Sequence, residues 1–196
     1  MPHDHHRVSG SCPGASPVRD NLPELLAPAG SPEALTAAVA AGADAIYLSG
    51  RRFGARRYAA NFSDEELRSA VDYAHLRGVR VYVTVNTLIR DAELPDVAAY
   101  LLWLYETGVD AVLVQDTGVA SLAREVVPDL PLHASTQMTV HNREGVARVA
   151  REGFSRVVLA RELTLPEIEG IAEDGEAQGI GVEVFAHGAL CYCYTG

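Results

Sequence analysis

The chain has 196 residues, of which 48% are hydrophobic and 21% charged, and its formal net charge at pH 7 is −10. This composition is typical of a globular protein with enough chain for one sizeable core. The negative charge argues against nucleic-acid binding through bulk electrostatics, although it leaves room for a local basic patch.

The segments expected of a membrane or secreted protein are not found in the sequence. No apolar run approaches the ~20 residues of a membrane span, and the N-terminus lacks the apolar core of a signal peptide. The three cysteines, two of them separated by one residue, do not form a disulfide framework. We therefore expect no membrane association, a cytoplasmic location, and cysteines that are metal ligands or spare thiols.

Two regions differ in their patterning. Residues 1–20 are rich in His, Ser, Pro and Gly without a hydrophobic period, which predicts a disordered tail. Residues 21–196 repeat one unit: a short apolar run, an amphipathic helical stretch, then a glycine that opens the next apolar run. Glycine at this point favours a left-handed cap between helix and strand. It recurs at Gly42, Gly78, Gly108, Gly153 and Gly179.

These units predict alternating strands and helices. The expected strands are Leu22–Ala27, Ala45–Leu48, Val79–Val85, Ala111–Val114, Leu132–Ala134, Arg156–Leu159 and Val182–Phe185. The expected helices are Pro32–Ala41, Asp64–Arg77, Leu94–Thr107, Gly118–Val127, Arg143–Glu152 and Leu165–Glu173. Ser31 and Ser63 are expected to cap the first two helices.

Strand–helix units in series imply parallel strands, and nearly all-apolar strands suit burial on both faces. The pattern predicts an α/β protein, a (β/α)₈ TIM-type barrel truncated after its seventh strand. An open doubly wound sheet is the alternative, weakened because the first unit lacks a G-x-G-x-x-G loop. Since an unclosed barrel leaves edge strands unpaired, we expect the chain to be a fragment of a longer protein.

In such a barrel the strand-to-helix loops form the catalytic face. Asn86 and Gln137 carry donors and acceptors that suit either a polar substrate or a structural network. Arg161 and Glu162 suit an internal ion pair or a substrate clamp, with Glu162 as a possible general base. His187 is a candidate acid–base group. The candidate catalytic residues are therefore Asn86, Gln137, Arg161, Glu162 and His187.

A second group of polar residues suggests an anion site. Arginine binds carboxylate or phosphate through paired hydrogen bonds, so we expect RNA phosphate or a small carboxylate as the ligand. The alternative is a solvated loop paired with the acidic helix start, and for Asp116 a helix cap is the simpler interpretation. The candidate substrate-binding residues are Arg51, Arg52, Arg56, Arg57 and Asp116.

The last stretch carries a specific resemblance. Its pattern Glu183-x-Phe185-x-x-Gly188-Ala189-Leu190-Cys191-x-x-x-x-Gly196 resembles the signature of the U32 family, historically called collagenase-like peptidases. The stretches 25–31, 41–47, 133–137 and 159–163 resemble the same family. The resemblance implies a barrel and, as in several members, a 4Fe–4S cluster held by four cysteines. By that likeness Cys191 is the first ligand, and the other three are not in this chain.

The reaction follows from the resemblance rather than from a motif. Neither H-E-x-x-H nor G-x-S-x-G is present, and only a Cys191–His187 pair keeps a peptidase possible. Better-characterised members are linked to oxygen-independent hydroxylation of a uridine in tRNA, a cytidine in 23S rRNA or ubiquinone precursors. Our hypothesis is an iron–sulfur-dependent hydroxylase acting on RNA. The alternatives are a U32 peptidase and a non-catalytic binding module.

Overall fold

The structure is a computed structural model that describes residues 22–55 and 61–188. Its strands form one parallel sheet whose spatial order, β1 to β7, is also the order along the chain. They are β1 (Leu26–Pro28), β2 (Ala45–Leu48), β3 (Arg80–Val85), β4 (Ala111–Val114), β5 (Leu132–Ala134), β6 (Arg156–Val158) and β7 (Gly181–Glu183). This order confirms the barrel and excludes a doubly wound sheet, in which the strand order reverses.

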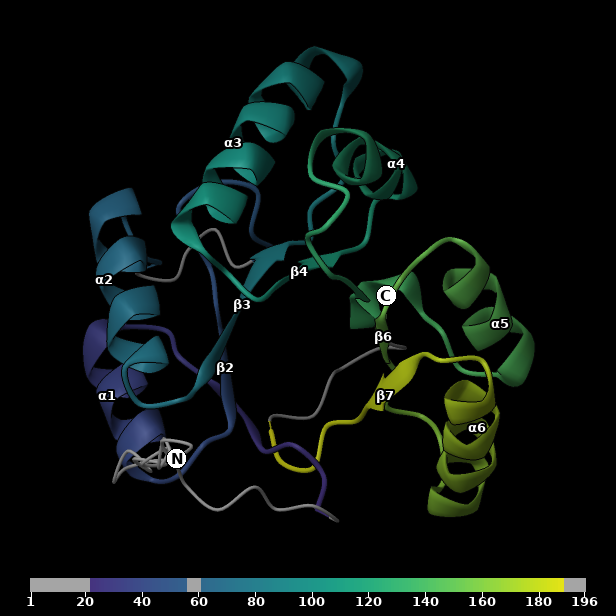
Figure 1. The fold of residues 1–196 in the computed structure, drawn as a ribbon. Helices are drawn as coiled ribbons and strands as arrows, with labels where there is room; N and C mark the ends of the chain where they lie inside the picture. The colour runs from purple at the N-terminus through teal and green to yellow at the C-terminus, as the bar shows by residue number, and fades with distance from the viewer. Residues whose placement is uncertain (1–21, 56–60, 189–196) are drawn as a thin grey trace, which may run out of the picture.

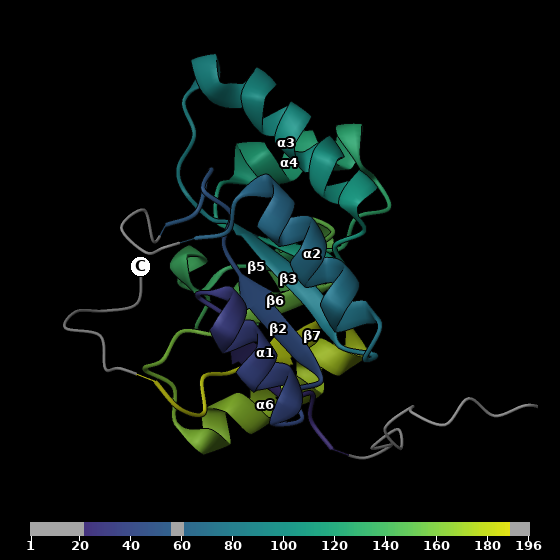
Figure 2. The ribbon, with the colours of Figure 1, turned by 90° about the vertical axis from the view of Figure 1, so that its left-hand side faces the viewer.

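Helices follow the strands and cover the outside of the curled sheet, as Figure 1 shows and as the side view in Figure 2 repeats. They are α1 (Pro32–Ala40), α2 (Asp64–His75), α3 (Leu94–Thr107), α4 (Thr117–Val126), α5 (Arg143–Arg151) and α6 (Leu165–Ala177), with short 3₁₀ helices η1 (Asp91–Glu93) and η2 (Thr136–Met138). Among the described residues, no helix is long and apolar enough to cross a membrane.

Alternation along the strands divides the core in two. Outward side chains such as Ile46, Val81 and Val83 are fully buried beneath the helices. Inward side chains, among them Tyr82 and Leu113, form a separate cluster inside the barrel. Because both faces of the strands are buried, their sequences are nearly continuous apolar runs.

The predicted glycine turns and serine caps of the helices are confirmed. Gly108 ends α3 in the left-handed conformation, with φ 86°, and its N–H returns to the carbonyls of the last turn. The glycines at 42, 78, 153 and 179 also have positive φ. Ser63 forms a capping box with Glu66 at the start of α2, and the Ser31 hydroxyl accepts from the Ala34 N–H at the start of α1.

Several predicted boundaries were wrong, and the largest errors are at the first strand and the last helix. The first strand begins at Leu26 rather than Leu22, because the Leu25 N–H donates to the Asp44 carboxylate instead of continuing the ladder. The last helix runs on to Ala177 rather than Glu173, and Gly179 supplies its left-handed turn. The last strand ends at Glu183 rather than Phe185, and the predicted tail, residues 1–20, lies outside the described residues.

Within the described ranges, β1 and β7 are the two edges of the sheet. Large apolar side chains beside these edge strands are exposed: Leu25, just before β1, is 51% exposed, and Val184 and Phe185, just after β7, are 45% and 39% exposed. In Figure 1 this open side lies between α1 and α6. The open side of the barrel is therefore bounded by β1 and by β7.

Candidate functional site at the barrel mouth

A cavity of about 280 Å³ opens at the carboxyl ends of the strands. This is the end where barrel enzymes carry their sites. Its walls come from strand ends and the loops that follow them. The lining residues are Pro28, Ala29, Gly30, Tyr47, Leu48, Ser49, Ala55, Asn61, Thr84, Asn86, Leu113, Thr136, Gln137, Val158, Arg161, Glu183 and Phe185.

Asn86 and Gln137, both predicted from the sequence, meet at this cavity. Asn86 Nδ2 donates to Ser135 Oγ over 3.4 Å, and Ser135 Oγ donates to Gln137 Oε1 over 3.1 Å. Asn86 Oδ1 accepts from the Ala55 N–H at 3.1 Å. These contacts fix the amides in a structural network while both side chains still line the cavity, so the two interpretations left open by the sequence are compatible.

Arg161 is the third predicted residue in the cavity wall, and it lies against a ring that the site prediction did not include. Its guanidinium carbon is 4.1 Å from the centroid of the Phe185 ring, a cation–π contact. Glu162, its neighbour in sequence, does not line this cavity, and His187 is exposed beyond the end of β7. The cavity therefore combines one cation with an aromatic surface at its rim.

Arg51 and Arg52 lie against the start of α2 and do not line the cavity. Arg52 Nη2 is 2.8 Å from Asp64 Oδ2, and its guanidinium lies 4.4 Å from the centroid of the Tyr100 ring. Arg51 Nη2 is 4.0 Å from Glu66 Oε2. These pairs match the alternative of a loop joined to the acidic helix start. Arg56 and Arg57 lie outside the described residues.

Asp116 caps α4 and ties a loop to it. Its Oδ1 accepts from the N–H groups of Gly118 and Val119 at 2.8 and 3.1 Å, and its Oδ2 accepts from the Ile89 N–H at 3.1 Å. Both carboxylate oxygens therefore have structural partners. This is the geometry of a helix cap, which is the simpler interpretation given above. A substrate contact at Asp116 stays a prediction.

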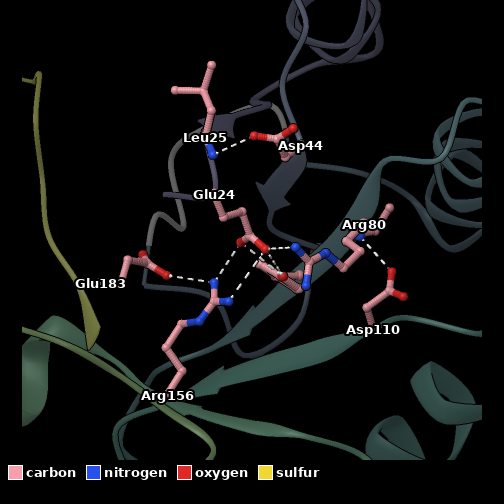
Figure 3. Close-up of polar contacts among 9 residues, drawn as sticks. Glu24, Leu25, Asp44, Arg80, Asp110, Arg156 and Glu183 are labelled. Atoms are coloured by element: carbon pink, nitrogen blue, oxygen red, sulfur yellow. Dashed lines mark hydrogen bonds and ion pairs between the residues drawn. The ribbon is translucent and has the colours of Figure 1, made fainter. Parts of the chain in front are cut away.

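Beneath the cavity, the charged side chains of Glu24, Arg80, Arg156 and Glu183 form a cluster (Figure 3). Glu24 receives hydrogen bonds from Arg156 Nη1 at 2.7 Å and from the Tyr82 hydroxyl at 3.0 Å, and it also pairs with Arg80. Arg156 Nη1 lies 3.5 Å from Glu183 Oε2 on its other side. Arg156 thus joins a carboxylate before β1 to one on β7.

Glu183 belongs both to this cluster and to the cavity wall. Burial raises the pKa of its carboxyl, an effect that the nearby Arg156 guanidinium opposes. The site prediction missed this residue, although a signal was available. Glu183 is a charged residue on an otherwise apolar strand, and every second residue of a strand lies on the same face, which for Glu183 is the inside of the barrel.

His133 is another polar residue buried in the barrel. It is 5% exposed, its ring lies edge-on to Tyr82 with centroids 4.7 Å apart, and its Nδ1 has no partner among the described residues. Burial, reinforced by Arg156 and Arg80, lowers the pKa of His133 to about 3. The imidazole is therefore neutral at physiological pH, which avoids a further positive charge beside the two arginines.

The expected cluster ligand lies outside the part of the chain that the structure describes. The described ranges contain no cysteine, and Cys191 falls among residues 189–196. Within those ranges no group of three or more His, Cys, Asp or Glu side chains could hold a metal ion. The described residues thus supply no thiolate for an iron–sulfur cluster, which needs cysteine ligands.

The strand order and the cavity define the class of protein: a parallel α/β barrel with a polar site at the carboxyl ends of its strands. Residues 30–196 match the model of Peptidase family U32. The chain belongs to that family. The solved structure of the U32 peptidase Mk0906 resembles it with a TM-score of 0.67 at 20% identity, over 93% of this chain and 71% of that one.

Curated relatives are more similar in sequence. The chain is 41% identical over 173 residues to the 23S rRNA 5-hydroxycytidine C2501 synthase of Escherichia coli K12. This match covers 88% of this chain and 25% of that protein. It is 38% identical over 174 residues to tRNA hydroxylation protein P1 of Bacillus subtilis 168, covering 89% and 40% respectively. The chain thus spans between a quarter and two fifths of these two relatives.

Proposed function

We propose that this chain is the barrel part of an oxygen-independent hydroxylase that modifies a base in rRNA or tRNA. The observation that carries the proposal is its identity of 38–41%, over 88–89% of its length, to two proteins named for rRNA and tRNA hydroxylation. The family match over residues 30–196 includes most of the residues that line the mouth cavity. The cavity is therefore the part of the chain that we assign to the RNA target.

The cavity has features that suit this role. Its amides, Asn86 and Gln137, are held in place and suit the polar edge of a base, and its rim carries Arg161 beside Phe185. The formal net charge of −10 disfavours nonspecific attraction to RNA. In this proposal recognition depends on local groups at the mouth rather than on the overall field of the chain.

The proposal includes the cofactor implied by the family resemblance. Cys191 is proposed as one thiolate ligand of a 4Fe–4S cluster that carries the redox chemistry. The test is iron and acid-labile sulfide content in the natural full-length protein, purified without oxygen. A Cys191→Ser variant should contain less of both, whereas equal iron in the two proteins would remove Cys191 from the proposed site.

Complementation tests the function itself. The natural full-length gene is expressed in an Escherichia coli strain that lacks the 5-hydroxycytidine synthase and the tRNA hydroxylation proteins. Mass spectrometry of digested rRNA and tRNA should show a hydroxylated pyrimidine nucleoside reappearing. RNA that stays unmodified, although the protein is soluble and loaded with iron, would contradict the proposal and make peptide cleavage the next assay.

A further inference from the structure

Glu183 is the carboxylate in the wall of the mouth cavity. Its side chain is 17% exposed, so it is mostly buried yet reaches the cavity. Arg156 holds it from below at 3.5 Å, and Arg156 is itself fixed by Glu24 at 2.7 Å. Figure 3 shows Arg156 between the two carboxylates. Arg156 therefore holds the Glu183 side chain in place, and the carboxylate offers a hydrogen-bond acceptor to the cavity.

Aromatic and cationic surfaces stand at the same cavity. Tyr47 and Phe185 both line it, from β2 and from the residues just after β7. Arg161 also lines the cavity, and its guanidinium lies against the Phe185 ring. Aromatic side chains stack on any base, and guanidinium groups bind phosphate. An acceptor, ring surfaces and a cation are the groups that a single nucleotide would need.

The size of the cavity limits what can enter it. A volume of about 280 Å³ is near the lower end of small-molecule pockets. It accommodates one nucleotide but not a paired stretch of RNA. Enzymes that act on a base in structured nucleic acid turn the target out of its stack and enclose it. A target in rRNA or tRNA would have to reach this cavity in that way.

We infer that the mouth cavity binds a single extruded pyrimidine nucleotide, and that Glu183, positioned by Arg156, accepts a hydrogen bond from an N–H group on the edge of its base. The choice of a pyrimidine rests on the proposed function. Cytosine offers its exocyclic amino group and uracil its ring N–H, so the carboxylate suits either base. The Phe185 ring provides the stacking surface, and Arg161 faces the nucleotide phosphate.

Nucleotide binding tests this assignment without requiring the reaction. The natural full-length protein is titrated with cytidine 5′-monophosphate and uridine 5′-monophosphate, followed by NMR. Ribose 5-phosphate serves as the probe that lacks a base. At least one pyrimidine nucleotide should bind about tenfold more tightly than ribose 5-phosphate, because base contacts and stacking are lost in the latter.

Two variants locate the binding groups. Glu183→Gln keeps the shape of the side chain but replaces one acceptor oxygen with an amide, and it should weaken nucleotide binding about tenfold. Phe185→Ala removes the stacking ring at a position already 39% exposed, so folding is little affected, and binding should fall by about as much. Glu173→Gln, on the exposed side of α6, is the matched control and should bind as the wild type does.

The outcomes separate this inference from the proposed function. Glu183-dependent nucleotide binding without RNA hydroxylation would support the base site and contradict the hydroxylase. RNA hydroxylation that persists in Glu183→Gln and Phe185→Ala, with nucleotide affinity unchanged, would overturn the base site and keep the hydroxylase. Absence of saturable binding for both pyrimidine nucleotides to a folded wild-type protein would also overturn the base site.

Discussion

Arg156 donates a hydrogen bond to Glu24 over 2.7 Å although 132 positions separate the two residues in the chain. The contact crosses the barrel interior from β6 to the residue that precedes β1 by two positions. It fixes the start of the sheet to its far side, where Glu183 also contacts Arg156. The Arg156 guanidinium therefore links Glu24, just before β1, to Glu183 in the wall of the mouth cavity.

Removing Glu24 should be costly for stability. Its side chain is 14% exposed and that of Arg156 19%, so Glu24→Ala removes the near partner of a largely buried guanidinium, whereas Arg80, at 52% exposed, stays in contact with solvent. We expect the free energy of unfolding of the full-length protein to fall by about 2–4 kcal/mol. Urea unfolding followed by circular dichroism measures this change.

A matched control distinguishes this buried cluster from an ordinary surface pair. Arg51 and Glu66 are 66% and 46% exposed and lie 4.0 Å apart. Arg51→Ala should therefore change the free energy of unfolding by less than about 0.5 kcal/mol. An equal loss in Glu24→Ala and Arg51→Ala would refute a structural role for the interior cluster.

His133 should make the protein sensitive to acid. Its pKa is about 3 in the folded state against about 6.5 for an ordinary histidine. Because the folded pKa is the lower one, the unfolded chain takes up a proton that the folded chain refuses. The stability conferred by a neutral His133 is complete above pH ~6.5 and is lost as the pH falls from there towards ~3.

The His133→Phe variant isolates this effect. It keeps an edge-on aromatic contact with Tyr82 but does not titrate. Between pH 6 and 4, the unfolding free energy of the wild type should fall more steeply than that of the variant, by up to ~1.4 kcal/mol per pH unit. Parallel pH dependences in the two proteins would show that His133 is protonated as easily when folded as when unfolded.

Gly50 should resist substitution because of Tyr100. A Cβ at this position would lie 2.2 Å from the Tyr100 hydroxyl oxygen, which is buried and has no hydrogen-bond partner among the described residues. Gly50→Ala should cost about 1–3 kcal/mol of stability through overpacking. Tyr100→Phe, which removes the unpaired hydroxyl, should be neutral or slightly stabilising.

The double variant tests the clash directly. In Gly50→Ala with Tyr100→Phe, the offending oxygen is absent, so most of the cost of Gly50→Ala should be recovered. Thermal unfolding of the four proteins gives the coupling energy. Additive effects of the two substitutions would mean that the strain at Gly50 comes from its backbone and not from Tyr100.

Asp116 distinguishes a helix cap from a substrate contact. Asp116→Ala removes the acceptors for Gly118, Val119 and Ile89 and should lower the free energy of unfolding by about 1–2 kcal/mol. Asp116→Asn keeps an acceptor for the α4 cap and should recover most of that loss. A variant that keeps full stability but loses RNA hydroxylation would instead support a substrate contact.

Local sequence signals predicted most of the fold. The left-handed cap at Gly108 and the capping box at Ser63 involve only residues a few positions away, so both can be predicted from the local sequence. The start of β1 could not be read in this way. Leu22 and Leu25 looked like strand residues, but the chain there is held by Asp44 and by charges from β3 and β6, which are distant in sequence.

Dependence on residues distant in sequence also explains which site residues were predicted and which were missed. Asn86, Gln137 and Arg161 were predicted because they follow strands, and the parallel sheet brings such positions to one mouth. Arg52 also follows a strand, yet its side chain turns to Asp64 and Tyr100, a choice that depends on tertiary neighbours. Glu183 was missed because its importance comes from Arg156 beneath it rather than from its neighbours in sequence.

The central claim, that this family member hydroxylates RNA, is tested most directly in its own host. The gene is deleted, total rRNA and tRNA are digested to nucleosides, and the digests from deletion and parent strains are compared by mass spectrometry. We predict that one pyrimidine nucleoside carrying an extra oxygen atom is lost in the deletion strain and restored by the wild-type gene but not by Cys191→Ser. Identical nucleoside profiles in the parent and deletion strains would contradict the claim.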